Sequence, residues 1–256
     1  MTPRLYHNAP LAAHATAALS QAQAHYLRSV LRREAGAELR LFNASDGEYA
    51  AKIVEIGKKT VIAEIGRRLR APEAESDIEL LIAPVKRAAI EMIIQKGTEL
   101  GAQRFRFVFT DRTNADRIRV DRLQAIALEA AEQCGRLSVP EVVAPARLAE
   151  MLLRWNAERT LYYCDEAGDD PDEEWGGSHG RAEPLLDVVP AIGTPTTQAA
   201  ILTGPEGGFS PDERKWLRAL PFVKPATLGP RILRADTAAI VALALWQAKA
   251  GDLARR

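Results

Sequence analysis

Cysteine and histidine are scarce in this sequence of 256 residues. The two cysteines, Cys134 and Cys164, cannot build a disulfide framework, and the four histidines are scattered without metal-ligand spacing. We therefore expect a cytoplasmic protein without a metal site. No apolar run approaches the roughly 18 residues of a membrane helix, and the first ten residues lack the apolar segment of a signal peptide.

An excess of either charge is also missing, because 34 Lys and Arg stand against 34 Asp and Glu. The charge is nevertheless uneven: residues 1–70 hold 11 basic and 6 acidic residues, a balance of +5, which leaves −5 for the rest. Such asymmetry can mark a domain that faces nucleic acid, although an ordinary solvated surface is the commoner cause of a small imbalance.

The first 70 residues are predicted to be mostly β-structure. A short helix through His25–Arg33 ends near Gly36, and the polar stretch Arg70–Ser76 predicts a linker. Between them lie three runs of apolar or β-branched residues that are typical of strands: Glu38–Phe42, Tyr49–Ile56 and Thr60–Ile65.

After the linker, predicted strands and helices alternate. The strands are Ile78–Pro84, Arg104–Thr110 and Thr160–Cys164, and the helices are Ala88–Leu100 and Asp121–Cys134. Alternation of this kind predicts an α/β domain with a mainly parallel sheet and helices on both faces.

Two glycine-containing loops near the C-terminus carry the strongest functional signal. The first, TGPEGGFSPDE (Thr203–Glu213), follows a short apolar strand and opens a helix, because Ser210 and Glu213 form a capping box. The second, LGPRILRADTA (Leu228–Ala238), follows the run Phe222–Thr227 and leads into the helix Thr237–Ala250. Neither loop has the G-x-G-x-x-G or Walker A pattern, so a Rossmann or P-loop site is not supported.

Together the two loops resemble the C-terminal signature of the RsmE family within the SPOUT methyltransferases. Three more segments resemble the family in the same order: HYLRSVLRREAG (His25–Gly36), QKGTELG (Gln95–Gly101) and EQCGRLSVPE (Glu132–Glu141). The resemblance implies a trefoil-knotted α/β domain (73–256) that binds S-adenosylmethionine (SAM), a PUA-like RNA-binding β-barrel (1–72), and a homodimer. It also implies methylation of uridine N3 in 16S ribosomal RNA of the small subunit. Another RNA nucleotide as target, and a non-catalytic RNA-binding protein with this fold, are the alternatives.

The resemblance implies that the two loops hold SAM through backbone groups and an apolar slot for adenine. Ordinary core packing and turn geometry are the alternative for the same residues. The predicted cofactor-binding residues are Leu202, Thr203, Gly204, Glu206, Gly208, Leu228, Gly229, Ile232 and Leu233.

Methylation at uridine N3 requires loss of a proton and stabilisation of negative charge on the uracil oxygens. Arginine suits the second task, and Arg136 is the first candidate, followed by Arg112 and Arg234. A phosphate contact or a structural ion pair is as plausible for each. Glu132 is a candidate general base, although an acid at a helix end is the commoner reading.

Four arginines of the N-terminal domain are candidates for contacts to RNA phosphates: Arg4, Arg28, Arg32 and Arg33. An ordinary surface position is the commonest alternative, and the family resemblance favours RNA contact for Arg32 alone. The stretch Asp165–Glu174 holds seven acidic residues in ten and departs from the family pattern. Its composition predicts a solvated, flexible insertion without a chemical role.

Overall fold

The computed structural model describes residues 2–57, 60–114, 118–170, 172–191 and 198–254. The chain forms two compact units. The first contains residues 1–74 together with 131–139, and the second contains residues 75–130 and 140–256.

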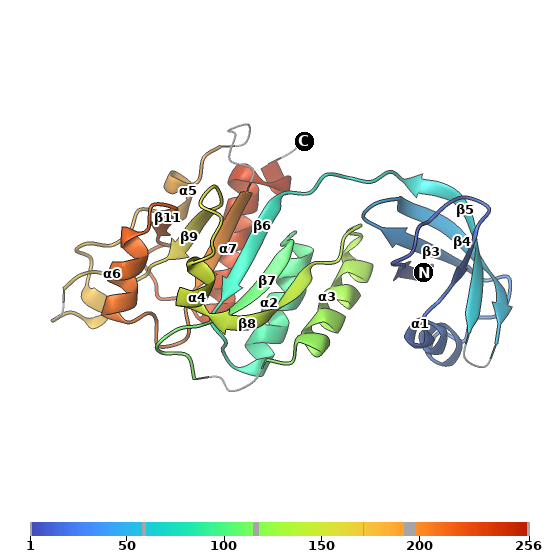
Figure 1. The fold of residues 1–256 in the computed structure, drawn as a ribbon, viewed down its shortest axis with the longest axis horizontal. Coiled ribbons are helices and arrows are strands. Elements are labelled where there is room, and N and C mark those ends of the chain that lie inside the picture. The colour runs from blue at the N-terminus through green and yellow to red at the C-terminus, as the bar shows by residue number, and fades with distance from the viewer. Residues whose placement is uncertain (1, 58–59, 115–117, 171, 192–197, 255–256) are drawn as a thin grey trace. The chain divides into compact units, whose positions relative to one another are not determined.

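A five-stranded curled sheet makes up most of the first unit, in the order β1-β3-β4-β5-β2 (Figure 1). Only the β1–β3 pair is parallel among these strands. Leu27 from the neighbouring helix joins side chains from all five strands in one core. The strand bounds are Arg4–Tyr6 (β1), Thr16–Ala18 (β2), Glu38–Asn43 (β3), Gly47–Ile56 (β4) and Val61–Arg70 (β5).

The helix of this unit begins earlier than the sequence predicted. Ser20 and Gln23 form a capping box that starts α1 (Gln21–His25), which continues into the π-helical η1 (Tyr26–Val30). Arg32 then adopts a left-handed backbone with φ of 51°. The helix therefore ends before Arg33, the predicted last residue.

Six parallel strands form the sheet of the second unit, in the order β11-β9-β10-β6-β7-β8. This confirms the predicted parallel α/β fold. The bounds are Asp77–Ile82 (β6), Arg104–Phe109 (β7), Glu141–Arg147 (β8), Thr160–Cys164 (β9), Gln198–Thr203 (β10) and Val223–Ala226 (β11).

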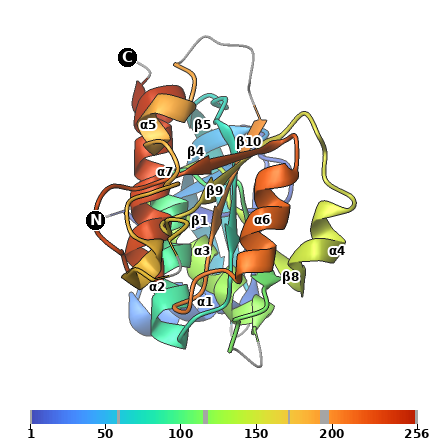
Figure 2. The same cartoon turned by 90° about the vertical axis from the view of Figure 1, so that its left-hand side faces the viewer.

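Helices cover both faces of this sheet, as Figure 2 shows. One face packs on α2, α3, α5 and α7, and the other on α4 and α6. None of the helices in the described part of the chain has the length and apolar character to cross a membrane. The helix bounds are Arg87–Glu99 (α2), Val120–Cys134 (α3), Leu148–Leu152 (α4), Leu185–Val188 (α5), Pro211–Ala219 (α6) and Ala235–Ala250 (α7), with short 3-10 turns at Glu174–Gly176 (η2) and Asp252–Ala254 (η3).

Candidate functional site

The two glycine-containing loops lie at the same edge of the parallel sheet. The first follows β10 and the second follows β11, and β9 lies between these strands. Because parallel strands end at one edge, both loops and the residues after β9 meet at the carboxyl ends of the strands, where α/β sheets bind ligands. We call the loops 204–210 and 227–234 the first and second cofactor loops.

The first cofactor loop is fixed by the predicted capping box. Ser210 Oγ accepts from the backbone N–H of Glu213 at 3.1 Å, and the Glu213 carboxylate accepts from the backbone N–H of Ser210 at 2.9 Å. Pro211 starts α6. Glycine is needed at two positions of this loop for different reasons. A Cβ on Gly204 would lie 2.7 Å from the Phe209 ring and clash with it. Gly208 has a left-handed φ of 64°, a backbone conformation that favours glycine.

The second cofactor loop leaves open space beside Gly229. This residue has φ of 115°, and a Cβ placed on it would meet no protein atom within 4 Å. The Thr227 hydroxyl holds the turn by donating to the Gly229 carbonyl at 3.2 Å. Leu228 is half-buried against the core, and Ile232 is 43% exposed.

A small cavity of about 40 Å³ lies between the ends of β9 and β11. Predicted residues Leu228 and Leu233 line it. Leu202 and Thr203 are buried at the end of β10, and Glu206 is exposed. Sequence reasoning missed the remaining lining residues, which are Cys164, Asp165, Glu166, Ala226, Thr227, Arg231 and Ala238.

The order of the strands could have identified part of this missed set. The predicted strand Thr160–Cys164 pairs with β11 in parallel, Ala226 opposite Cys164, so the residues after it must reach the same edge. Burial raises the pKa of the Cys164 thiol, which keeps this side chain protonated and makes it a poor nucleophile.

Arg112 lies beside the first cofactor loop. Its Nη1 donates to the Gly207 carbonyl at 2.9 Å. The neighbouring Asp111 is bonded to the start of α6, because its carboxylate accepts from Ser210 Oγ at 2.7 Å. Arg234, by contrast, is exposed at the N-cap of α7, and no ion pair among the described residues includes it.

Arg136 and Glu132 group with the N-terminal unit. The Glu132 carboxylate accepts from the backbone N–H of Tyr6 at 3.0 Å, and Arg136 Nε donates to Ser138 Oγ at 2.8 Å. The Glu132 contact agrees with the reading of this residue as an acid at a helix end.

Arg4 is engaged within the same unit. It donates to the carbonyls of Ala131 and Arg136 at 2.8 and 2.5 Å, pairs with Glu48 at 3.0 Å, and stacks on Phe42. Its side chain is only 11% exposed. These contacts favour a structural role for Arg4, and they attach the segment 131–139 to β1.

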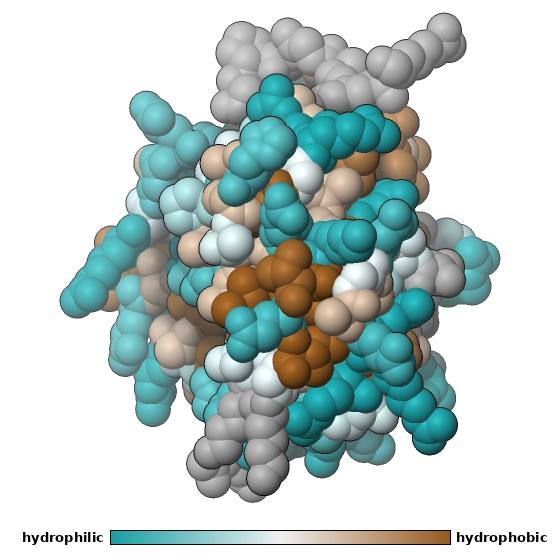
Figure 3. Space-filling model, turned by 90° about the vertical axis from the view of Figure 1, so that its right-hand side faces the viewer, coloured by the Kyte–Doolittle hydropathy of each residue, from teal (hydrophilic) through white to brown (hydrophobic). Residues whose placement is uncertain are grey.

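The other arginine candidates are more accessible. Arg28 and Arg32 are exposed, and Arg33 is half-buried. Figure 3 shows a molecular face that is mostly hydrophilic around one compact apolar patch. The large exposed apolar residues of the N-terminal unit are Tyr26, Val30 and Val54, of which one is aromatic, so extensive base stacking is not indicated.

The prediction of a wholly solvated insertion at 165–174 is wrong. Asp165 is 1% exposed and accepts from Arg214 Nε at 2.9 Å and Arg218 Nε at 2.7 Å, both on α6. Arg214 also donates to the carbonyls of Ala167 and Gly168. The acidic composition thus reflects pairing with α6 as well as solvation.

Asp165→Ala is expected to lower the free energy of unfolding by about 2–3 kcal/mol, because two arginines lose a buried partner. Urea denaturation would measure the loss. Asp169→Ala is the matched control, since its 43% exposed carboxylate contacts the same two arginines and should contribute less than about 1 kcal/mol. Equal losses of unfolding free energy in the two variants would show that Asp165 is not the main partner of these arginines.

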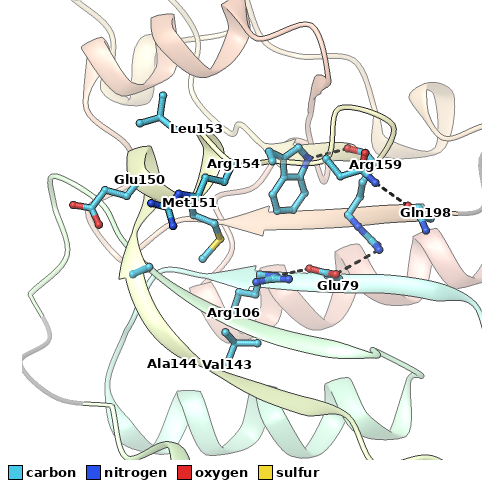
Figure 4. A pocket seen from close by; sticks show the side chains of 13 residues that line it. Glu79, Arg106, Val143, Ala144, Glu150, Met151, Leu153, Arg154, Arg159 and Gln198 are labelled. Carbon is cyan, nitrogen blue, oxygen red and sulfur yellow. Dashed lines mark hydrogen bonds and ion pairs between the residues drawn. The ribbon is translucent and has the colours of Figure 1, made fainter.

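A larger cavity of about 670 Å³ lies elsewhere on the second unit (Figure 4). Its floor is Glu79, which pairs with Arg106 at 2.5 Å, with Arg159 at 3.4 Å and with Arg104. Glu79 lies near the start of β6, away from the carboxyl ends of the strands. Because the buried carboxylate is neutralised by these arginines, we read the cluster as structural.

Within the described ranges, no three His, Cys, Asp or Glu side chains gather in a way that could hold a metal ion.

Comparisons with known proteins agree on one family. The RNA methyltransferase domain family matches residues 72–247, and the RNA methyltransferase PUA domain family matches residues 19–66. The ribosomal RNA small subunit methyltransferase E of Rickettsia conorii is 32% identical over 94% of this chain and 93% of its own length.

Solved structures give the same result. A Legionella pneumophila methyltransferase in complex with SAM superimposes with a TM-score of 0.82 at 30% identity, covering 98% of this chain and 99% of the other. The ribosomal RNA small subunit methyltransferase E of Neisseria gonorrhoeae, bound to SAM, gives 0.83 at 27% identity with the same coverage.

Proposed function

This chain belongs to the RNA methyltransferase family, and on that premise we propose that it transfers a methyl group from SAM to N3 of a uridine in 16S ribosomal RNA. The observation that carries the proposal is the position of both glycine loops at the carboxyl edge of the parallel sheet, where the second loop lines a small cavity. The proposal includes the trefoil knot that the family resemblance implies, and a cytoplasmic location, where ribosomal RNA is made and modified.

The residues at this edge fit SAM. Gly229 leaves space that a side chain would fill, and Gly208 has a left-handed φ of 64° that a side chain would strain. Leu228 and Leu233 supply apolar surface for an adenine ring. We therefore propose that SAM is held by these four residues with Leu202, Thr203, Gly204 and Ile232, and that the exposed Glu206 has a minor role.

SAM supplies an electrophilic methyl group on a positively charged sulfur. The chain must then orient the uracil ring, assist the loss of the N3 proton and stabilise charge on the uracil oxygens. We propose Arg136 for the last task, because arginine stays charged and offers a fork of donors. Arg112 supports the first cofactor loop through Gly207, and Arg234 and Glu132 remain secondary candidates.

We propose that residues 1–72 supply RNA affinity through Arg28, Arg32 and Arg33. These residues follow one another along η1 and the turn after it, and two of them are exposed. Arg4 leaves this set because its guanidinium is engaged by the segment 131–139.

Arg32→Asn is expected to weaken binding to all RNA sequences to a similar extent. The slope of log affinity against log salt concentration should fall in magnitude by about 1, as loss of one phosphate contact does. Asparagine tolerates the left-handed backbone at this position, so the fold should be kept. Arg147→Asn, which removes an 81% exposed arginine of the second unit, is the control. RNA binding at several salt concentrations measures both, and identical slopes would remove Arg32 from the RNA-binding set.

We further propose a homodimer through α7. The half-buried Ile240, Val241 and Ala244 recur on one face of this helix and are not among the residues packed on the core, while its opposite face carries Leu243 and Trp246 into the core. A helix that is apolar on both faces needs a second partner.

Sedimentation is expected to give about twice the 28.0 kDa of one chain, and Ile240→Glu should yield monomers because a charge would be buried in the contact. Leu153→Glu, at a residue 85% exposed near α4, should remain dimeric. A monomeric wild-type protein would contradict the proposal.

The function is tested by nucleoside mass spectrometry of 16S ribosomal RNA from a strain that lacks the protein. We expect loss of N3-methyluridine and its restoration by purified protein with SAM. Loss of a different methylated nucleoside would favour another RNA target, and no loss of any methylated nucleoside would favour a non-catalytic RNA-binding protein.

A further inference from the structure

The insertion after β9 contacts the first cofactor loop. A Cβ built on Gly208 would lie 3.0 Å from Glu166 Oε1 and 3.3 Å from Trp175 Cζ3. Glu166 also lines the small cavity. Two side chains of the insertion thus stand directly against the left-handed glycine of the first cofactor loop.

The same insertion and its continuation also contact the second cofactor loop. Arg181 Nη2 donates to the Gly229 carbonyl at 3.3 Å. The backbone N–H of Thr227 donates to the Glu183 carbonyl at 2.8 Å, and the backbone N–H of Leu185 donates to the Thr227 carbonyl at 3.0 Å. Residues 165–170 and 172–185 therefore contact both loops, while Arg214 and Arg218 hold the start of this segment on α6.

Trp175 is held in an unfavourable backbone conformation. Its φ of 55° is left-handed, which a tryptophan seldom adopts, yet its carbonyl accepts from the Gly168 N–H at 2.8 Å. The neighbouring Gly176 carbonyl accepts from Asp170 at 3.0 Å. The surrounding bonds thus maintain a strained residue beside Gly208, and such strain is most often kept at ligand sites.

The two carboxylates at the end of β9 differ in their partners. Asp165 is neutralised by two arginines, whereas no ion pair among the described residues includes Glu166. Burial raises the pKa of Glu166. The positive charges of Arg214 and Arg181 lower this pKa by less than burial raises it. A cationic ligand in the cavity would further stabilise the charged carboxylate.

The small cavity accounts for only a part of the space that a ligand of the size of SAM needs. About 40 Å³ is far below the roughly 300 Å³ at which ligand pockets of this kind begin. The rest of the cofactor would lie outside this cavity, where the space beside Gly229 is open.

We infer that residues 165–170 and 172–181 form a wall of the cofactor site, in which Glu166 opposes the sulfonium charge of SAM and Trp175 covers the loop at Gly208. This inference rests on the proposed SAM-dependent function. S-adenosylhomocysteine, the product, lacks the sulfonium charge, so Glu166 favours SAM over the product, and Trp175 contributes apolar contact to both.

Calorimetric titration of the full chain with SAM and with S-adenosylhomocysteine tests the inference. Glu166→Gln is expected to weaken SAM binding about tenfold and product binding less than about twofold, because it removes one charge interaction. Trp175→Ala should weaken both by a similar factor of about ten. Glu174→Gln, which removes an exposed charge next to Trp175, is the control and should change neither.

The outcomes separate this inference from the proposed function. If the wild-type chain binds no SAM, the proposed function fails. If the wild type binds SAM and Glu166→Gln and Trp175→Ala bind it equally well, the insertion is no part of the site. An equal loss for SAM and product in Glu166→Gln would contradict the charge role of Glu166.

Discussion

Gly229→Val is expected to reduce SAM affinity by about two orders of magnitude or more. A Cβ at this position points into space that no protein atom occupies within 4 Å, and we propose that the cofactor fills it. The valine methyl groups would compete with the ligand for that space. The backbone φ of 115° adds strain, because a β-branched residue tolerates a positive φ poorly.

Strain alone could also lower affinity by destabilising the fold, so the experiment needs a matched variant. Gly36 has φ of 91°, and a Cβ there meets only Lys52 Cε at 3.8 Å. Gly36→Val in the N-terminal unit therefore introduces similar strain far along the chain from both loops. We expect both variants to lose comparable thermal stability and only Gly229→Val to lose SAM binding in calorimetry. Equal SAM affinity in the two would remove the second cofactor loop from the site.

Local sequence signals predicted most of the second unit. The strand Thr160–Cys164 agrees with the structure to the residue, and the capping box at Ser210 fixed the start of α6. Strand β8 was missed because Pro145 interrupts its β-pattern, and the structure places it at the edge of the sheet, where proline is tolerated. Strands β1 and β2 are three residues long, too short for periodicity to identify.

The parts of the site that sequence reasoning missed depend on contacts between distant residues. Seven acids in ten predict solvation, but Arg214 and Arg218, about fifty positions away, bury Asp165. Arg4 is a candidate for RNA contact from its sequence, yet its partners Ala131 and Arg136 lie more than 125 residues along the chain. Composition and spacing cannot indicate such pairs, whereas the glycine loops were found because their turn chemistry is local.

Arg136→Ala is expected to lower kcat by about 10²–10³ with little change in SAM affinity, as the loss of one charge-stabilising donor in a transition state does. The structure gives this side chain a defined orientation. Arg136 is half-buried, its Nε donates to Ser138 Oγ at 2.8 Å, and its carbonyl is held by Arg4. The hydrogen bond to Ser138 thus orients the Arg136 side chain before any substrate binds.

Three comparisons distinguish this role from a phosphate contact. A phosphate-binding arginine would weaken RNA affinity and flatten its salt dependence, with kcat at saturating RNA nearly intact. Arg136→Lys keeps the positive charge and loses the paired N–H donors of the guanidinium. A rate close to that of the alanine variant therefore indicates paired hydrogen bonds to uracil. Arg112→Ala should instead weaken SAM binding, because Arg112 supports Gly207 of the first cofactor loop. Single-turnover methylation at saturating RNA measures the two Arg136 variants, RNA binding at several salt concentrations measures the phosphate alternative, and calorimetry with SAM measures Arg112→Ala. A wild-type rate in Arg136→Ala would exclude Arg136 from the chemistry and leave Arg234 as the next arginine to replace.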